Sequence, residues 1–127
     1  MIRPACLLAF SAALLPATLL FATPSLAQSA EKGKAAFAQC AACHGTKPGE
    51  KKMGPTLAGV VGRKAGTLAG LTAPSQALAK FGKTWTAKDL NAFLTAPAKL
   101  VPGTRMVIAV PDATRRADII AYLATLK

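Results

Sequence analysis

The residues best suited to chemistry are Cys40, Cys43 and His44, which form a C-x-x-C-H run. Two cysteines three positions apart, followed at once by a histidine, have the spacing of covalent haem attachment. The two thiols lie about one helical turn apart, so both can face one porphyrin and bond to its vinyl groups. The adjoining imidazole is then the proximal ligand of the iron. We therefore predict one covalently bound haem c.

Two other uses of a C-x-x-C pair compete with this interpretation. A zinc site needs four ligands, and no cysteine or histidine follows His44 in the chain. A thioredoxin-like dithiol belongs beside a βαβ pattern, which the sequence does not have. Haem attachment is favoured over both.

The ligand on the opposite side of the iron has three possibilities. His44 is the only histidine, so this chain cannot supply a second one. Met53 lies nine residues after His44, which would force the chain around the haem edge at once. Met106 lies 62 residues after His44, behind a Pro-Gly turn, and can reach the far side without strain. We favour Met106 over Met53 and over an open site.

Short helices are expected to position these residues. The alanine-rich stretch 31–43 predicts a helix with Phe37 and Cys40 on one side. Gly33 within it either weakens the helix slightly or allows a second helix to cross closely. A short helix is expected from Pro74 or Ser75 to Lys80, ending near Gly82. Another is expected from a capping-box-like start at Thr86 to Pro97. The last is expected after Asp112, with an apolar face of Ile119, Ile120, Leu123 and Leu126. We predict an all-α fold of about four to five short helices and long loops.

The stretch 45–70 is too rich in glycine for a regular element, and 99–106 is a further loop with Pro-Gly turn chemistry. A loop as long as 45–70 fits a compact domain when it packs on a haem. The Pro55 carbonyl is free to accept a bond from the second nitrogen of His44. Arg63 is either a surface charge or the partner of a haem propionate. Trp85 is expected in the core, where its N–H needs an acceptor.

The first 27 residues have the pattern of a secretory signal peptide. Arg3 precedes an apolar run over 5–21, and the small residues of Ser25-Leu26-Ala27 follow. An uncleaved membrane anchor is the alternative, but Pro16 interrupts the apolar run and Pro24 follows it. We expect cleavage after Ala27, export to the periplasm, and a single domain over 28–127 with no stable membrane insertion.

The domain that remains is strongly basic. The chain has 16 lysines and arginines against five acidic residues, and removal of Arg3 leaves a net charge of +10. Such a charge indicates an anionic partner. The sequence has no basic run with interleaved aromatic residues, the pattern that would suggest nucleic acid. The acidic faces of redox proteins are therefore the expected partners. We expect a monomer.

Several motifs together resemble the class I cytochrome c family, of the mitochondrial and bacterial c2 type, over nearly all of 30–127. Besides the C-x-x-C-H run these are Gly54-Pro55-x-Leu57, Gly62-Arg63-Lys64-x-Gly66, Trp85, the loop Val101-Pro102-Gly103-Thr104-Arg105-Met106, and Arg116-Ala117-Asp118-Ile119-Ile120-Ala121-Tyr122-Leu123. The resemblance implies axial ligation by His44 and Met106. It also implies that the first and last helices cross at Gly33, Phe37 and Tyr122.

The resemblance places further residues by role. Pro55, Arg63, Trp85 and Thr104 would line the haem pocket, and Lys34, Lys52, Lys99 and Arg105 would lie in the positive ring that docks acidic partners. The sequence departs from the family in one respect: the tyrosines usual near 68–70 and 71–75 are missing, and Tyr122 is its only tyrosine.

These observations predict an electron carrier that cycles between Fe(II) and Fe(III) and is not an enzyme. With both axial positions filled, no place remains for a substrate. The alternatives are a haem subunit of an exported dehydrogenase and, less favoured, a gas-binding or peroxidatic haem protein with a labile Met106.

Overall fold

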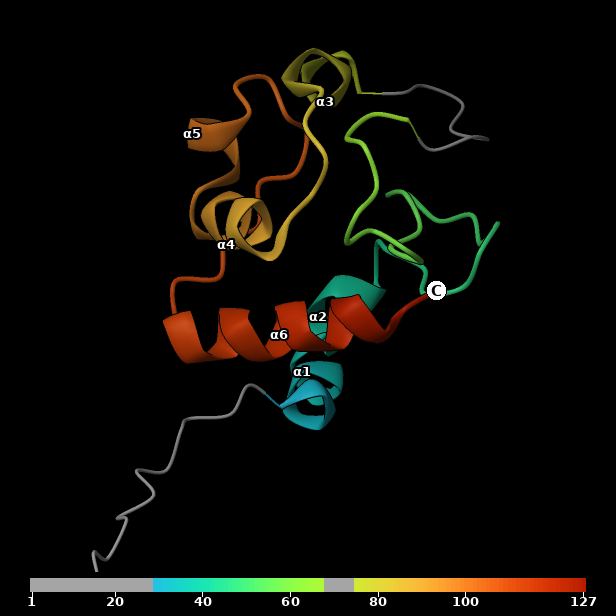
Figure 1. The fold of residues 1–127 in the computed structure, drawn as a ribbon, viewed down its shortest axis with the longest axis vertical. Helices are drawn as coiled ribbons and strands as arrows, with labels where there is room; N and C mark the ends of the chain where they lie inside the picture. Colours follow the sequence, from blue (N-terminus) through green and yellow to red (C-terminus); the bar gives the residue numbers. More distant parts are fainter. Residues whose placement is uncertain (1–28, 68–74) are drawn as a thin grey trace, which may run out of the picture.

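The computed structural model describes residues 29–67 and 75–127 (Figure 1). The expected signal peptide, and the stretch 68–74 where the family tyrosines are missing, lie outside these residues. The helices are α1 (Ala30–Ala36), α2 (Ala38–Ala41), α3 (Gln76–Phe81), α4 (Ala87–Thr95), α5 (Pro97–Leu100) and α6 (Ala113–Thr125). The described residues form no strand, only an isolated bridge between Lys64 and Thr84. The all-α prediction is confirmed.

Side-chain caps begin four of these helices. Thr86 and Asp112, both expected as caps, accept hydrogen bonds from the N–H groups of Asp89 at 3.1 Å and Arg115 at 2.6 Å. Ser29 caps α1 and Ser75 caps α3 in the same way. Each oxygen satisfies an N–H that has no partner inside the first turn.

Two helix boundaries differ from the prediction. The first helix is divided at Phe37, where the Cys40 N–H bonds to the Phe37 carbonyl at 2.7 Å in a tighter turn, and α2 ends at Ala41 rather than at Cys43. Pro97 follows the end of α4, as expected. It also begins α5, whose last two residues, Lys99 and Leu100, were expected to be part of the loop 99–106. Proline suits the first helical position because it has no N–H to satisfy there.

Helices α1 and α6 cross in close contact, as the resemblance implied. A Cβ on Gly33 would collide with the backbone carbonyl of Asp118, so only glycine allows this approach. Beside this point the rings of Phe37 and Tyr122 lie 5.4 Å apart. Asp118 also accepts a hydrogen bond from the Ser29 N–H at 2.7 Å, which ties the start of α1 to α6. The close crossing, and not mild helix weakening, explains Gly33.

The core lies between this helix pair and the group α3 to α5, which Figure 1 shows above them. Trp85 is 6% exposed and packs between Phe81 and Phe93, with ring centroids 5.2 and 5.1 Å away. The other large members of the core are Phe37, Val60, Leu90, Leu94, Val101, Val110, Ile119, Ile120 and Leu123.

The irregular segment 42–67 runs along the other side of the molecule (Figure 1). Its Gly59 N–H bonds to the Leu126 carbonyl at 3.1 Å, and its Gly62 N–H bonds to the Trp85 carbonyl at 2.8 Å. These bonds fix the loop to the end of α6 and to the segment before α4. Within the part of the chain that the structure describes, no helix has the length and apolar character to cross a membrane.

Candidate haem site

The two thiols lie at the end of α2. Cys40 is within this helix and Cys43 is two residues beyond it, and both are half-buried and free. The N–H groups of Cys43 and His44 both bond to the Cys40 carbonyl, at 3.0 and 2.9 Å, so the helical turn continues through the motif. Burial raises the pKa of the Cys40 thiol, and the nearby charge of Arg115 opposes this shift.

The ring of His44 is held by the loop that follows it. Its Nδ1 lies 2.8 Å from the carbonyl oxygen of Pro55, which is the contact expected from the sequence. Next to this contact, a Cβ on Gly54 would lie 2.7 Å from the His44 Cε1 atom. The Gly54 N–H in turn bonds to the Cys43 carbonyl at 2.8 Å. The ring is therefore fixed by one hydrogen bond and by close backbone packing.

The loop between His44 and Pro55 is itself held by Glu50. One carboxylate oxygen of Glu50 accepts hydrogen bonds from the N–H groups of Thr46 at 2.9 Å and Lys47 at 3.2 Å. These bonds, aided by the Lys52 charge, lower the pKa of Glu50. Sequence reasoning missed this residue, because a single glutamate in a basic loop gives no signal of its own.

Arg63 is half-buried and not a freely solvated surface charge. Its guanidinium donates to the carbonyls of Ala58 at 2.8 Å and Thr56 at 3.0 Å, and burial lowers its pKa. Arg63 thus stabilises the loop after Pro55. Its contact with a haem propionate stays a prediction.

Met106 lies on the loop between α5 and α6 and is half-buried against the core. Its N–H lies 3.3 Å from the Thr104 hydroxyl, so Thr104, a predicted pocket residue, orders the backbone at this point. The two residues that follow are open to solvent, with Val107 83% and Ile108 55% exposed. Met53, the alternative ligand, is 87% exposed.

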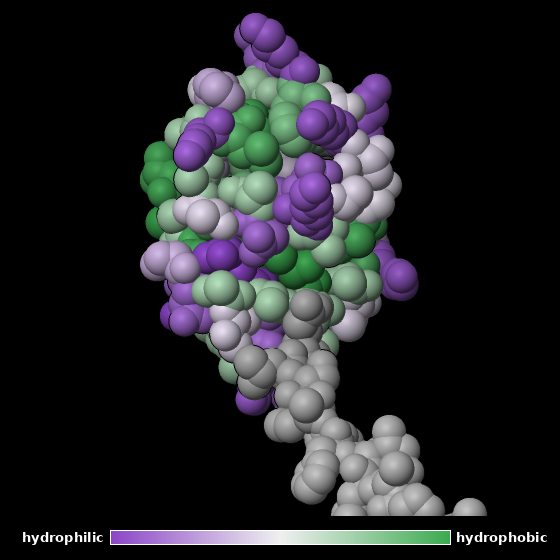
Figure 2. Space-filling view, turned by 60° about the vertical axis from the view of Figure 1, so that its left-hand side comes forward, coloured by the Kyte–Doolittle hydropathy of each residue, from purple (hydrophilic) through white to green (hydrophobic). Residues whose placement is uncertain are grey.

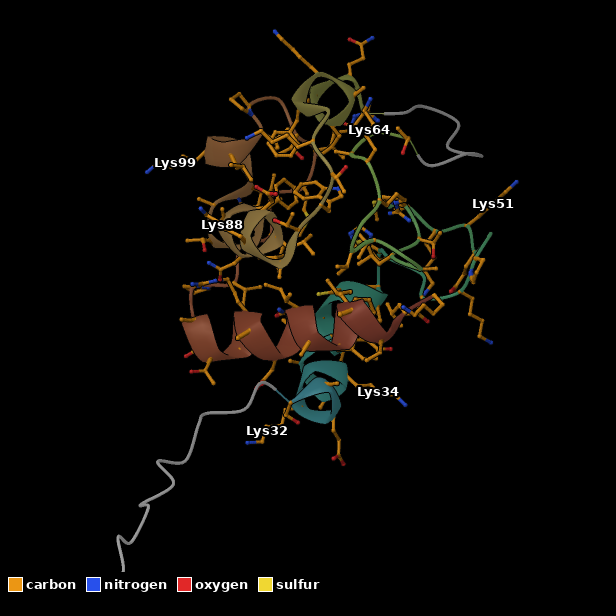
Figure 3. The ribbon with its side chains drawn as sticks, viewed as in Figure 1. Lys32, Lys34, Lys51, Lys64, Lys88 and Lys99 are labelled. Carbon is orange, nitrogen blue, oxygen red and sulfur yellow. The ribbon has the colours of Figure 1, made fainter. Side chains whose placement is uncertain are left out.

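The residues predicted to dock partners do not form one compact cluster. All four, Lys34, Lys52, Lys99 and Arg105, are exposed, but Figure 3 shows Lys34 beside α1 and Lys99 beside α5, at opposite ends of the molecule. Figure 2 shows hydrophilic side chains separated by hydrophobic areas on the face that it presents. Lys52 also bonds through its Nζ to the carbonyl of Ala41, the last residue of α2, at 2.7 Å. The positive charge is spread over the surface.

The donor set fits a haem c. It provides two free thiols on one continuous turn, an imidazole whose Nδ1 faces a carbonyl, and a thioether on a separate loop. A zinc ion fits less well, because residues 29–67 and 75–127 contain no group of three or more His, Cys, Asp and Glu side chains that could hold a metal.

Comparison with known proteins agrees with this chemistry. The model of the cytochrome c family matches residues 30–127. The chain belongs to the cytochrome c family. It is a class I c-type cytochrome, and this membership makes it an electron-transfer protein with covalently attached haem c rather than an enzyme.

Individual relatives are similar over most of their length. The cytochrome c2 of Blastochloris viridis is 41% identical over 102 residues, which cover 79% of this chain and 80% of that protein. The cytochrome c2 iso-2 of Magnetospirillum fulvum is 46% identical over 92 residues, 72% of this chain and 95% of its own. Among solved structures, cytochrome cH from Methylobacterium extorquens has a TM-score of 0.70 and 49% identity, and covers 76% of this cytochrome and 98% of its own chain.

Proposed function

We propose that this cytochrome carries single electrons between redox proteins of the periplasm, with His44 and Met106 as the axial ligands of its haem iron. The observation that carries the proposal is the 2.8 Å contact between His44 Nδ1 and the Pro55 carbonyl oxygen. Because a carbonyl oxygen only accepts, the ring proton belongs on Nδ1, and Nε2 keeps a lone pair for the iron. This geometry supports His44 as an oriented imidazole ligand.

The surroundings of the two methionines support Met106 as the second ligand. Met106 is half-buried and packs against the core. In the chain it stands between Val101 and Val110, whose exposed fractions are only 2% and 3%. Met53 is 87% exposed. A thioether is a weak ligand, so it stays bound only where packed chain holds it in place. Met106, which is packed against the core, satisfies this condition better than the exposed Met53.

The residues around the site suit electron transfer. When bound, haem c supplies an iron that alternates between Fe(II) and Fe(III). Cys40 and Cys43 would hold it covalently. The buried rings of Trp85 and Phe93 and the half-buried ring of Phe81 belong to the same apolar cluster as Cys40 and Met106. They would exclude water from the haem and disfavour the extra charge of the ferric state. His44 and Met106 together would leave no iron position for a substrate.

The compartment and partners are proposed from the sequence. The signal-like segment 1–27 supports export, and a net charge of +10 in residues 28–127 supports steered encounters with acidic faces of redox proteins. N-terminal sequencing of protein purified from a periplasmic extract should begin at Gln28. An N-terminus at Met1 in membrane-bound protein would instead favour the uncleaved anchor.

Voltammetry with a carbon monoxide titration tests the proposed function. The wild-type holoprotein should give one reversible one-electron wave, and its reduced spectrum should not change with carbon monoxide at neutral pH. Met106→Ala should bind carbon monoxide rapidly, whereas Met53→Ala, the matched control, should behave like wild type. Rapid binding by the wild type would contradict a closed iron and favour a gas-binding or peroxidatic role.

A further inference from the structure

Arg116 is a buried charge that the proposed site does not use. It lies in α6 and is 8% exposed. Its Nη1 donates to the carbonyls of Val110 and Pro111, both at 2.7 Å, and its Nε donates to the Asn91 side-chain oxygen at 3.0 Å. The one ion pair within 4 Å among the described residues joins Lys52 to Glu50, so carbonyl dipoles and not a carboxylate compensate Arg116. A buried charge is tolerated only with such hydrogen bonds.

The acceptors of Arg116 fix one end of the loop that carries Met106. Val110 is 3% exposed, and its N–H bonds to the Leu94 carbonyl of α4 at 2.7 Å. Its own carbonyl is held by Arg116 of α6. Residues 107–109, which separate Val110 from Met106, are all exposed. Val110 is therefore the first buried anchor after Met106.

The other end of this loop has an anchor of its own. Val101 is 2% exposed, and its N–H bonds to the Pro97 carbonyl at 2.9 Å. The Thr104 N–H then bonds to the Val101 carbonyl at 3.1 Å. Met106 thus lies on a span fixed at Val101 and Val110, and α4, α5 and α6 supply the anchoring groups (Figure 1).

We propose that Arg116 is a positioning residue for Met106. By joining the Val110 and Pro111 carbonyls to α6, and by reaching Asn91 of α4, it keeps the loop closed and the Met106 thioether on the iron. This inference rests on the proposed ligand role of Met106. Lysine cannot replace Arg116, because one ammonium group lacks the planar fork that serves three acceptors at once.

Imidazole binding to the ferric holoprotein measures how often the loop opens. An added ligand can bind only after Met106 leaves, so the rate at saturating imidazole equals the opening rate. Arg116→Lys should raise this rate about tenfold or more, which corresponds to about 1.4 kcal/mol. Asn91→Ala should raise it less, because the two carbonyl bonds remain. Asn91 is exposed, so this variant tests the proposal even where Arg116→Lys fails to fold.

Two controls separate positioning from general stability. Arg115→Lys makes the same change one residue away, where the side chain is exposed and bonds to Gln39. Ile119→Val shortens a side chain that is 1% exposed in the same helix and should lower the free energy of unfolding without faster opening. The proposal is overturned by an opening rate within twofold of wild type in Asn91→Ala and in any folded Arg116→Lys protein. It is also overturned if Ile119→Val loses as much unfolding free energy as the Arg116→Lys or Asn91→Ala protein and its loop opens as fast.

The proposed ligand has its own test in the same experiment. Met106→Ala should bind imidazole without an opening step, so its rate should rise in proportion to imidazole concentration. If the wild type already behaves in this way, the ligand assignment fails, whatever Arg116 does.

Discussion

The ring of His44 packs directly on the backbone of Gly54, where an added Cβ would lie 2.7 Å from Cε1 and 2.9 Å from Nδ1. The next residue, Pro55, gives the carbonyl that lies 2.8 Å from the same Nδ1 atom. One dipeptide therefore fixes both the position and the rotation of the imidazole. The missing side chain of Gly54 is what allows the loop to come so close.

Gly54→Ala should displace the His44 ring. The new methyl group overlaps ring atoms, and such overpacking typically lowers the free energy of unfolding by about 1–3 kcal/mol. The NMR resonances of the His44 ring protons in the reduced holoprotein should shift. Gly49→Ala is the control, since a Cβ there meets nothing within 4 Å and adds only the strain of a positive φ. Unchanged His44 resonances in Gly54→Ala would refute this account of the ring.

Gly33→Ala should weaken the crossing of α1 and α6. The new Cβ collides with the backbone carbonyl of Asp118, which cannot rotate away as a side chain would. We expect the free energy of unfolding in guanidinium to fall by about 3 kcal/mol, the upper end for overpacking. Ala35→Gly, on an exposed position of the same helix, should cost only about 1 kcal/mol. Equal losses in the two variants would argue against a close crossing.

Local signals predicted much of this fold. Thr86 and Asp112 cap helices as their sequence contexts indicated, and Gly33 and Tyr122 lie where the family resemblance put them. The contact between His44 and Pro55 was also expected, because the Pro55 carbonyl, a few residues after the motif, is free to accept from the second ring nitrogen. Each of these features depends on short spacing or on a motif with a defined geometry.

The remaining features depend on bonds between side chains and backbone groups, for which the sequence has no motif. Glu50 binds backbone N–H groups across a turn, and Lys52, expected to serve partners, bonds to the end of α2. Arg116 lies four residues before Ile120 on the helix, so its place on the apolar face of α6 could have been read from spacing. Its acceptors could not be predicted, because two of them are backbone carbonyls, which every residue has, and the third is the side chain of Asn91, 25 residues earlier in the chain.

Glu50 should make the stability of the loop depend on acid. Its pKa in the folded protein lies below the ordinary 4.5, so its contribution is complete above about pH 4.5 and is lost as the pH falls through the lower folded pKa. Glu50→Gln should therefore reduce the decline of the unfolding free energy in that range. Glu31→Gln, which removes the same charge from α1, is the matched control. Identical pH profiles for wild type and Glu50→Gln would contradict the role of this carboxylate.

The net charge should control the rate of electron exchange with anions. Reduction of the ferric holoprotein by ferrocyanide should slow as salt is added, because ions screen the attraction to a +10 domain. A neutral reductant should show little salt dependence. Since Lys34 and Lys99 lie at opposite ends of the molecule, Lys99→Gln and Lys34→Gln should slow the ferrocyanide reaction unequally. Equal salt dependence for charged and neutral reductants would rule out steering.

The central claim is that this cytochrome closes its iron with Met106. The absorption spectrum of the purified ferric holoprotein tests it most directly, through the charge-transfer band that a methionine-to-ferric-iron bond produces. We predict that the wild type and Met53→Ala have this band and that Met106→Ala lacks it. Loss of the band in Met53→Ala, or its retention in Met106→Ala, would contradict the assignment of the axial ligand.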